Sequence, residues 1–212
     1  MNFSRSERHA LCALLSTKGP DAPTLCEGWS TRDLAAHLVL REHRPDAATG
    51  ILVGPLAAYT ARVQRGIAQR HDYTDLVDII RQGPPRLSLF GMPGVDEHAN
   101  AVEYYVHHED VRRGSPGWQP RTFEAEVEDL LWHRLGMARL VLRRAPCGVT
   151  LVREGSAGTQ PIIAKRGSPA VTVSGAPGEL TLWATGRKSA ARVQQDGDED
   201  CVARLSQARW GL

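Results

Sequence analysis

The stretch EYYVHHED, residues 103–110, places acidic and imidazole side chains at helical spacing. On a helix, Glu103 and His107 lie one turn apart on the same face. Val106 lies beside that face, so we expect the polar groups to point partly into a helical bundle. Buried polar groups need partners, because leaving them unpaired is costly in free energy. The pattern predicts a helix over 97–113 that carries a chelating pair.

Working outward from this stretch, apolar residues recur at helical spacing up to about residue 145. At the start of one such segment, Ser30 or Thr31 can cap the first amides, and Asp33 favours the positive end of the helix. Antiparallel helices with short connections form a bundle, in which metal sites are built from side chains of facing helices. Further helices are expected over 4–16, 31–45, 55–69, 73–82 and 122–144.

After about residue 145 the apolar residues alternate instead, which indicates strands. Strands are expected over 148–153, 161–166, 170–174 and 192–195, with helices over 177–186 and 199–207. We therefore predict a mainly α protein with a small α+β module at its C-terminal end. The expected domains are a helical bundle over 1–145 and the α+β module over 146–212.

Composition excludes several classes of protein. The chain has 212 residues, 42% of them hydrophobic, and a formal net charge of +2, so nothing favours a nucleic-acid partner. Its longest uncharged stretch is broken by glycine and proline and is too short to span a membrane. Four widely spaced cysteines and charged N-terminal residues suggest reduced thiols and no export. We expect a soluble cytoplasmic protein, either monomeric or homodimeric.

His37 lies among leucines on its expected helix and is the best candidate for a third ligand beside Glu103 and His107. Two histidines and one carboxylate would leave positions open on a divalent ion, unlike a closed structural site. Asp110 would then orient a ligand imidazole. The competing interpretation is an ordinary core histidine that is satisfied by hydrogen bonds.

Two further features are interpreted structurally. A solvated helix face is expected to be formed by His108, Glu109, Arg112 and Arg113, rather than a second cluster of functional residues. Cys26 is expected to be an ordinary buried cysteine, with a reactive thiol as the alternative.

Three segments carry a family resemblance: LCEGWSTRDLAAHL (25–38), EYYVHHEDVRR (103–113) and GAPGELTLWATGR (175–187). Together they resemble actinobacterial members of the DinB/YfiT-like superfamily, and among these the mycothiol-dependent maleylpyruvate isomerases. The resemblance implies a DinB-like four-helix core with a sterol-carrier-like C-terminal module. It also implies that His37, Glu103 and His107 bind a divalent metal, usually Zn²⁺, with Ni²⁺, Fe²⁺, Co²⁺ or Mn²⁺ as other candidates. Arg187 corresponds to an arginine that faces the active site in the family, although it could instead only neutralise the end of a helix.

The leading hypothesis is an enzyme in which the metal activates a low-molecular-weight thiol, mycothiol by analogy, for attack on a small electrophile. Addition followed by elimination would give a cis–trans isomerase, and addition alone would give a thiol S-transferase. The alternatives are a non-catalytic metal-containing module that binds a small ligand or partner, and a bundle with a purely structural metal. The open coordination position argues against the last alternative.

Overall fold

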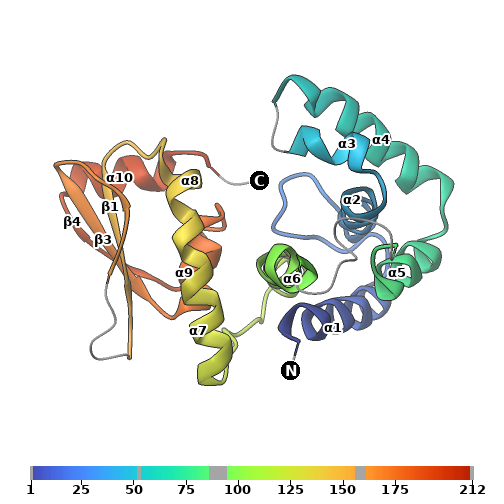
Figure 1. The fold of residues 1–212 in the computed structure, drawn as a ribbon, viewed down its shortest axis with the longest axis horizontal. Helices are drawn as coiled ribbons and strands as arrows, with labels where there is room; N and C mark the ends of the chain where they lie inside the picture. The colour runs from blue at the N-terminus through green and yellow to red at the C-terminus, as the bar shows by residue number, and fades with distance from the viewer. Residues whose placement is uncertain (1, 52–53, 86–94, 156–160, 211–212) are drawn as a thin grey trace. The chain divides into compact units, whose positions relative to one another are not determined.

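The structure is a computed structural model that describes residues 2–51, 54–85, 95–155 and 161–210. It is mostly helical with one small β-sheet, as predicted (Figure 1). The chain divides into two compact units, Met1–Trp118 and Gln119–Leu212. Within the described residues, no helix has the length and apolar character that a membrane span requires.

The first unit is a helical bundle. Helix α1 packs against α6 and α5, while α2 packs against α4 and α5 (Figure 1). Leucines at the contact faces, such as Leu11, Leu34 and Leu76, are fully buried in one continuous core. The helices are α1 (Phe3–Lys18), α2 (Thr31–His43), α3 (Pro45–Ala48), α4 (Ala57–Arg70), α5 (Tyr73–Gln82) and α6 (Val95–Arg112), with short 3-10 turns at Thr49–Ile51 and Gly54–Leu56.

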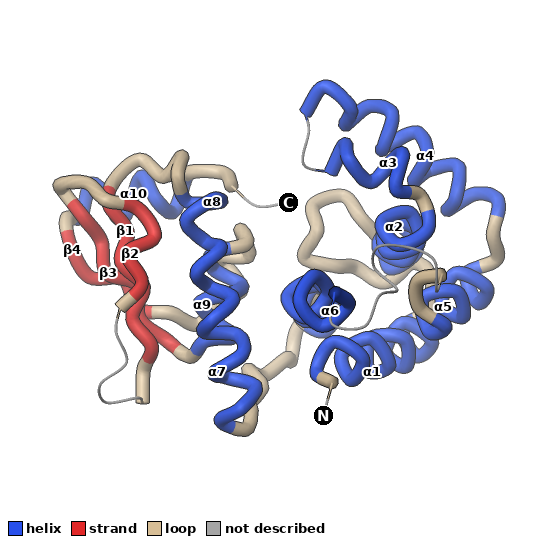
Figure 2. Tube along the Cα trace, in the orientation of Figure 1, coloured by secondary structure: helices blue, strands red, loops and turns tan. Residues whose placement is uncertain are grey.

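The second unit is built on a four-stranded sheet of order β2-β1-β3-β4 (Figure 2). The central strands β1 and β3 are parallel, and each outer strand is antiparallel to its neighbour. Buried residues of the strands and of the helices share one hydrophobic cluster, so the helices cover a single face of the sheet. The elements are α7 (Ala125–Arg134), α8 (Ala138–Leu142), β1 (Gly148–Arg153), β2 (Ile162–Lys165), β3 (Ala170–Gly175), α9 (Pro177–Ala184), β4 (Gln194–Gly197) and α10 (Glu199–Gln207).

The predicted domain boundary at 145/146 differs from the division seen in the structure, which falls after Trp118. The reason is that the helices after Trp118 bury their apolar side chains against the sheet. Leu135 and Leu142 belong to the same core cluster as Val149 and Val171. The change from helical to alternating periodicity marks a change of element within this unit.

The long helix predicted over 122–144 is also corrected. Helix α7 ends at Arg134, a 3-10 turn spans Leu135–Met137, and α8 follows. Gly136 lies in this turn, where its low helix propensity favours an interruption. Beyond the predicted end of α2, Pro45 begins the additional short helix α3, consistent with the preference of proline for the first helical position. Residues 86–94, between the helices predicted over 73–82 and 97–113, lie outside the described residues.

Candidate metal centre

The start of α2 is fixed by a reciprocal cap. The Ser30 side chain accepts a hydrogen bond from the Asp33 amide, and the Asp33 carboxylate accepts one from the Ser30 amide. With the helix starting there, His37 follows in the second turn and is buried next to Leu34 and Leu38. The cap therefore determines where the imidazole of His37 lies in the bundle.

The structure brings His37 of α2 together with Glu103 and His107 of α6. His37 Nε2 lies 3.5 Å from Glu103 Oε1, and His107 Nε2 lies 3.2 Å from the same oxygen. The three potential ligand atoms are all within 4.8 Å of one another. The two imidazole rings meet edge to face with their centroids 5.2 Å apart. The three residues singled out in the sequence thus converge on one place.

Arg41 completes the charge balance around Glu103. Its Nε lies 3.3 Å from Glu103 Oε1, and its guanidinium also donates to the side chain of Asn100. Burial by itself would raise the pKa of Glu103, but the charge of Arg41 and the two histidines hold that pKa well below its usual range. Glu103 is therefore a carboxylate and is available as an anionic ligand.

The two histidines differ in their electrostatic setting. Burial lowers the pKa of His37, which favours the neutral imidazole that a metal needs. Burial also acts to lower the pKa of His107, but its hydrogen bonds, led by the one to Asp110, outweigh burial and raise that pKa well above the ordinary value. The hydrogen-bond partners of His107 therefore stabilise the positively charged form of its imidazole.

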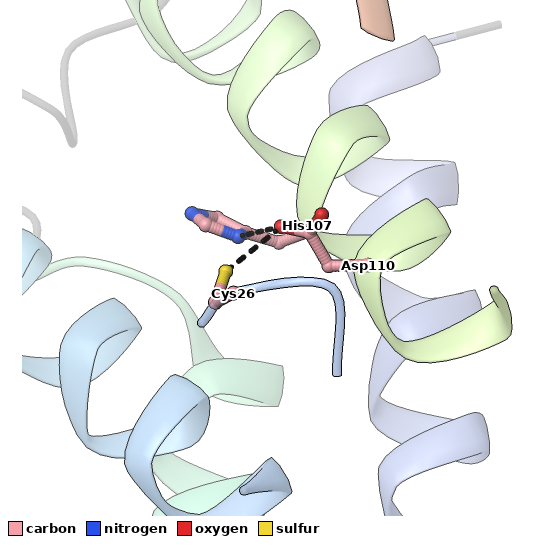
Figure 3. Close-up of side chains that lie close together, drawn as sticks. All are labelled: Cys26, His107 and Asp110. Atoms are coloured by element: carbon pink, nitrogen blue, oxygen red, sulfur yellow. Dashed lines mark hydrogen bonds and ion pairs between the residues drawn. The ribbon is translucent and has the colours of Figure 1, made fainter. Parts of the chain in front are cut away.

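Asp110 contacts Nδ1 of His107 (Figure 3), whereas Glu103 contacts the other ring nitrogen, Nε2. This carboxylate is fully buried, and its Oδ2 lies 2.9 Å from His107 Nδ1 and 3.2 Å from Cys26 Sγ. The loop that carries Cys26 is fastened to α6 by a backbone hydrogen bond of 3.0 Å from the amide of Leu25 to the carbonyl of Asp110. Asp110 therefore orients the ring of His107 and favours a proton on Nδ1.

These donors suit a divalent cation. Two imidazoles and one carboxylate form a ligand set that binds Zn²⁺ and related ions and leaves positions for an exogenous ligand. A carboxylate on the far nitrogen of a ligand histidine is the usual orienting group at such centres. Trp29 adds an apolar wall, with its ring centroid 5.1 Å from that of His37.

The expected solvated face on α6 is wrong. His108, Glu109 and Arg113 are all buried. His108 Nδ1 lies 2.9 Å from Glu7 Oε2 on α1, and Glu109 forms an ion pair with Arg113 in which both side chains are fully buried. The reason is that α6 packs against α1 on one side while its last turns contact the loop preceding α2. The four-residue spacing of Glu109 and Arg113 was the feature of the sequence that could have predicted this buried ion pair.

Cys26 is expected from the sequence to be an ordinary buried cysteine. The structure shows it half-buried, with its thiol directed at the carboxylate of Asp110 (Figure 3). Nothing in the spacing of residues 26 and 110 predicted this contact.

Arg187 belongs to the second unit, just beyond the end of α9. Its Nη1 donates a hydrogen bond of 2.7 Å to the carbonyl of Thr185, the C-cap residue of α9. This contact agrees with a role at the helix end, where positive charge is favourable. The role of Arg187 in catalysis stays a prediction.

Comparison with solved structures identifies the fold. One match is "Crystal structure of the mycothiol-dependent maleylpyruvate isomerase", with 19% sequence identity and a TM-score of 0.52, covering 92% of this chain and 90% of that chain. A second is a histidine-to-alanine mutant of an enzyme of the same name, with 17% identity, a TM-score of 0.51 and the same coverage. No family model matches the sequence, and no curated protein matches it. The chain thus shares the fold of these isomerases.

Proposed function

We propose that this protein is a metal-dependent enzyme that uses a low-molecular-weight thiol to act on a small electrophilic substrate. The observation that carries the proposal is the convergence of His37, Glu103 and His107, from two helices, around one point of the bundle. The shared fold with mycothiol-dependent isomerases supports mycothiol as the thiol. We place this chemistry in the cytoplasm, where thiols are kept reduced.

Each residue near the centre has a defined task. His37, Glu103 and His107 would hold the ion, for which we propose Zn²⁺, while Ni²⁺, Fe²⁺, Co²⁺ and Mn²⁺ accept the same donors. When bound, the ion would lower the pKa of the thiol and so supply a thiolate near neutral pH. Asp110 accepts a hydrogen bond from Nδ1–H of His107. The lone pair of the imidazole is then on Nε2, which can act as the metal ligand.

The reaction follows from the nucleophile. Addition of a thiol to an activated double bond, rotation about the resulting single bond and elimination of the same thiol would isomerise the substrate. If the adduct is released, the net reaction is S-transfer, with the thiol proton ending on the neighbouring carbon. We propose that Arg187 assists this step, so that Arg187→Ala would lower turnover without changing metal affinity.

Cobalt-substituted protein provides the test. We expect an added thiol such as mycothiol to produce a thiolate-to-metal charge-transfer band, with release of about one proton per thiol bound. His107→Ala should abolish both signals, because two remaining ligands hold the ion too weakly.

Cys26→Ser is the matched control and should leave the band intact, since the sulfur comes from the added thiol. Loss of the band in Cys26→Ser would show that the protein itself supplies the thiolate, and the proposal would fail. Cobalt binding without any band on adding thiol would equally refute it and favour a non-catalytic metal module.

A further inference from the structure

A second group of potential ligands adjoins the first. The thiol of Cys26, the Nδ1 of His107 and a carboxylate oxygen of Asp110 all lie within 4.8 Å of one another (Figure 3). Asp110 Oδ2 is the centre of the group, at 2.9 Å from the imidazole and 3.2 Å from the sulfur. The two groups share His107, but each uses a different nitrogen of its ring.

We infer that Cys26, His107 and Asp110 form a second metal site, selective for thiophilic divalent ions such as Cd²⁺, that competes with the first site for the imidazole of His107. The inference depends only on the geometry of these three side chains and does not require the proposed thiol chemistry.

The donor chemistry favours a soft ion. Sulfur and nitrogen donors with one carboxylate select ions such as Zn²⁺ and Cd²⁺ over Mg²⁺ or Ca²⁺. A thiolate from Cys26 and the carboxylate of Asp110 together neutralise a divalent ion, which matters because Asp110 is fully buried. Cys26 is only half-buried, whereas Asp110 is fully buried, so an ion would reach the group from the side of the Cys26 loop.

The position of the proton on the imidazole of His107 explains why the two sites compete. A neutral imidazole has a lone pair on only one ring nitrogen. An ion on Nδ1 of His107 requires the proton to sit on Nε2, where it can donate to Glu103 Oε1 at 3.2 Å. An ion on Nε2 requires the proton on Nδ1, where it donates to Asp110. The tautomer of His107 therefore selects which site is available.

Binding at the second site also breaks the S–H bond of Cys26. Its proton passes to solvent while the sulfur keeps the electron pair and donates it to the ion. Asp110 enters as the carboxylate, and no oxidant or reductant is needed.

The test is titration of the reduced full-length protein with Cd²⁺, followed by the ultraviolet thiolate-to-cadmium charge-transfer band. We expect the wild-type protein to develop the band with one equivalent of Cd²⁺. Cys26→Ser should lose the band and bind Cd²⁺ at least tenfold more weakly. The other three cysteines are present in both proteins and provide the background.

Glu103→Gln separates this inference from the proposed function. This variant should keep the Cd²⁺ band but bind Co²⁺ more weakly at the first site. Cys26→Ser should lose the Cd²⁺ band but bind Co²⁺ at the first site as the wild-type protein does. Saturation of the wild-type protein with Cd²⁺ should also reduce the Co²⁺ that it holds.

The inference is overturned if Cys26→Ser retains the Cd²⁺ band, if the wild-type protein shows none, or if Glu103→Gln abolishes it. Should Cys26→Ser fail to fold by circular dichroism, alkylation of the wild-type protein gives a second test. Cd²⁺ should then protect Cys26 from iodoacetamide, as mapped by mass spectrometry, and an unprotected Cys26 refutes the site. If the Co²⁺ protein shows the thiolate band with added thiol but the wild-type protein shows no Cd²⁺ band, the second site is refuted and the proposed function stands.

Discussion

Substitution of Asp110 by asparagine is expected to weaken metal binding without abolishing it. Asp110 is fully buried, and its Oδ2 lies 2.9 Å from His107 Nδ1, so it provides a charge-assisted hydrogen bond to a proposed ligand. An asparagine keeps the shape but loses the negative charge that makes the imidazole a better donor. Removal of such an orienting group typically lowers metal affinity about 10- to 100-fold. This corresponds to about 1.4 to 2.8 kcal/mol.

Competition with a chromophoric chelator measures this loss directly, with Zn²⁺ added to the metal-free protein. Asp78→Asn is the matched control, because Asp78 is an exposed carboxylate on α5 that pairs only weakly in energetic terms with Arg81. An unchanged Zn²⁺ affinity in Asp110→Asn would refute the orienting role. Complete loss of Zn²⁺ binding in a folded variant would instead make Asp110 a direct ligand of the first site, formed by His37, Glu103 and His107, and would also refute our reasoning.

Three further predictions concern stability, each measured by urea unfolding. Glu109→Gln should cost about 3–5 kcal/mol, since it removes the negative charge from a fully buried ion pair with Arg113. Arg112 is another partner of the Glu109 carboxylate, and its side chain is 24% exposed. Arg112→Gln should therefore cost below about 1 kcal/mol. An alanine Cβ at Gly114 would lie 2.1 Å from a backbone oxygen of a neighbouring loop, so Gly114→Ala should cost about 1–3 kcal/mol. Gly66 lies within a helix, and a Cβ there would meet open space. Gly66→Ala should therefore stabilise the protein by about 0.5–1 kcal/mol. Ser30→Ala should cost about 1 kcal/mol by removing the cap of α2. Equal effects at 109 and 112, or at 114 and 66, would contradict the packing described here.

Local signals predicted the elements of the fold well. Ser30 and Asp33 placed the beginning of α2 correctly, and the strand over 148–153 and the helix over 199–207 have their predicted bounds. The predicted domain boundary differs from the division of the structure after Trp118, because periodicity shows that a face is apolar but not which element covers it. The apolar side chains of α7 and α8 could cover either a bundle or a sheet, and in this chain they cover the sheet.

The candidate site divides along the same line. Glu103 and His107 are four residues apart on one helix, so their spacing alone predicted that they would meet. His37 required a tertiary contact, and its position among buried leucines indicated the side of the helix that would make it. Cys26 was different, because its approach to α6 depends on a loop that contacts the helix through residues distant in sequence, as in the backbone hydrogen bond from Leu25 to Asp110. No local pattern encodes such a contact.

The burial of α6 was missed for a related reason. A surface helix shows one polar face, and that asymmetry reveals which side is solvated. In α6 polar side chains are buried on more than one side because they have polar partners there: Glu7 of α1 contacts His108, and Arg113, just past the end of the helix, pairs with Glu109. Polarity therefore does not report exposure on this helix. The more informative cue is an acid and a base spaced by one helical turn, since such a pair allows both charges to be buried together.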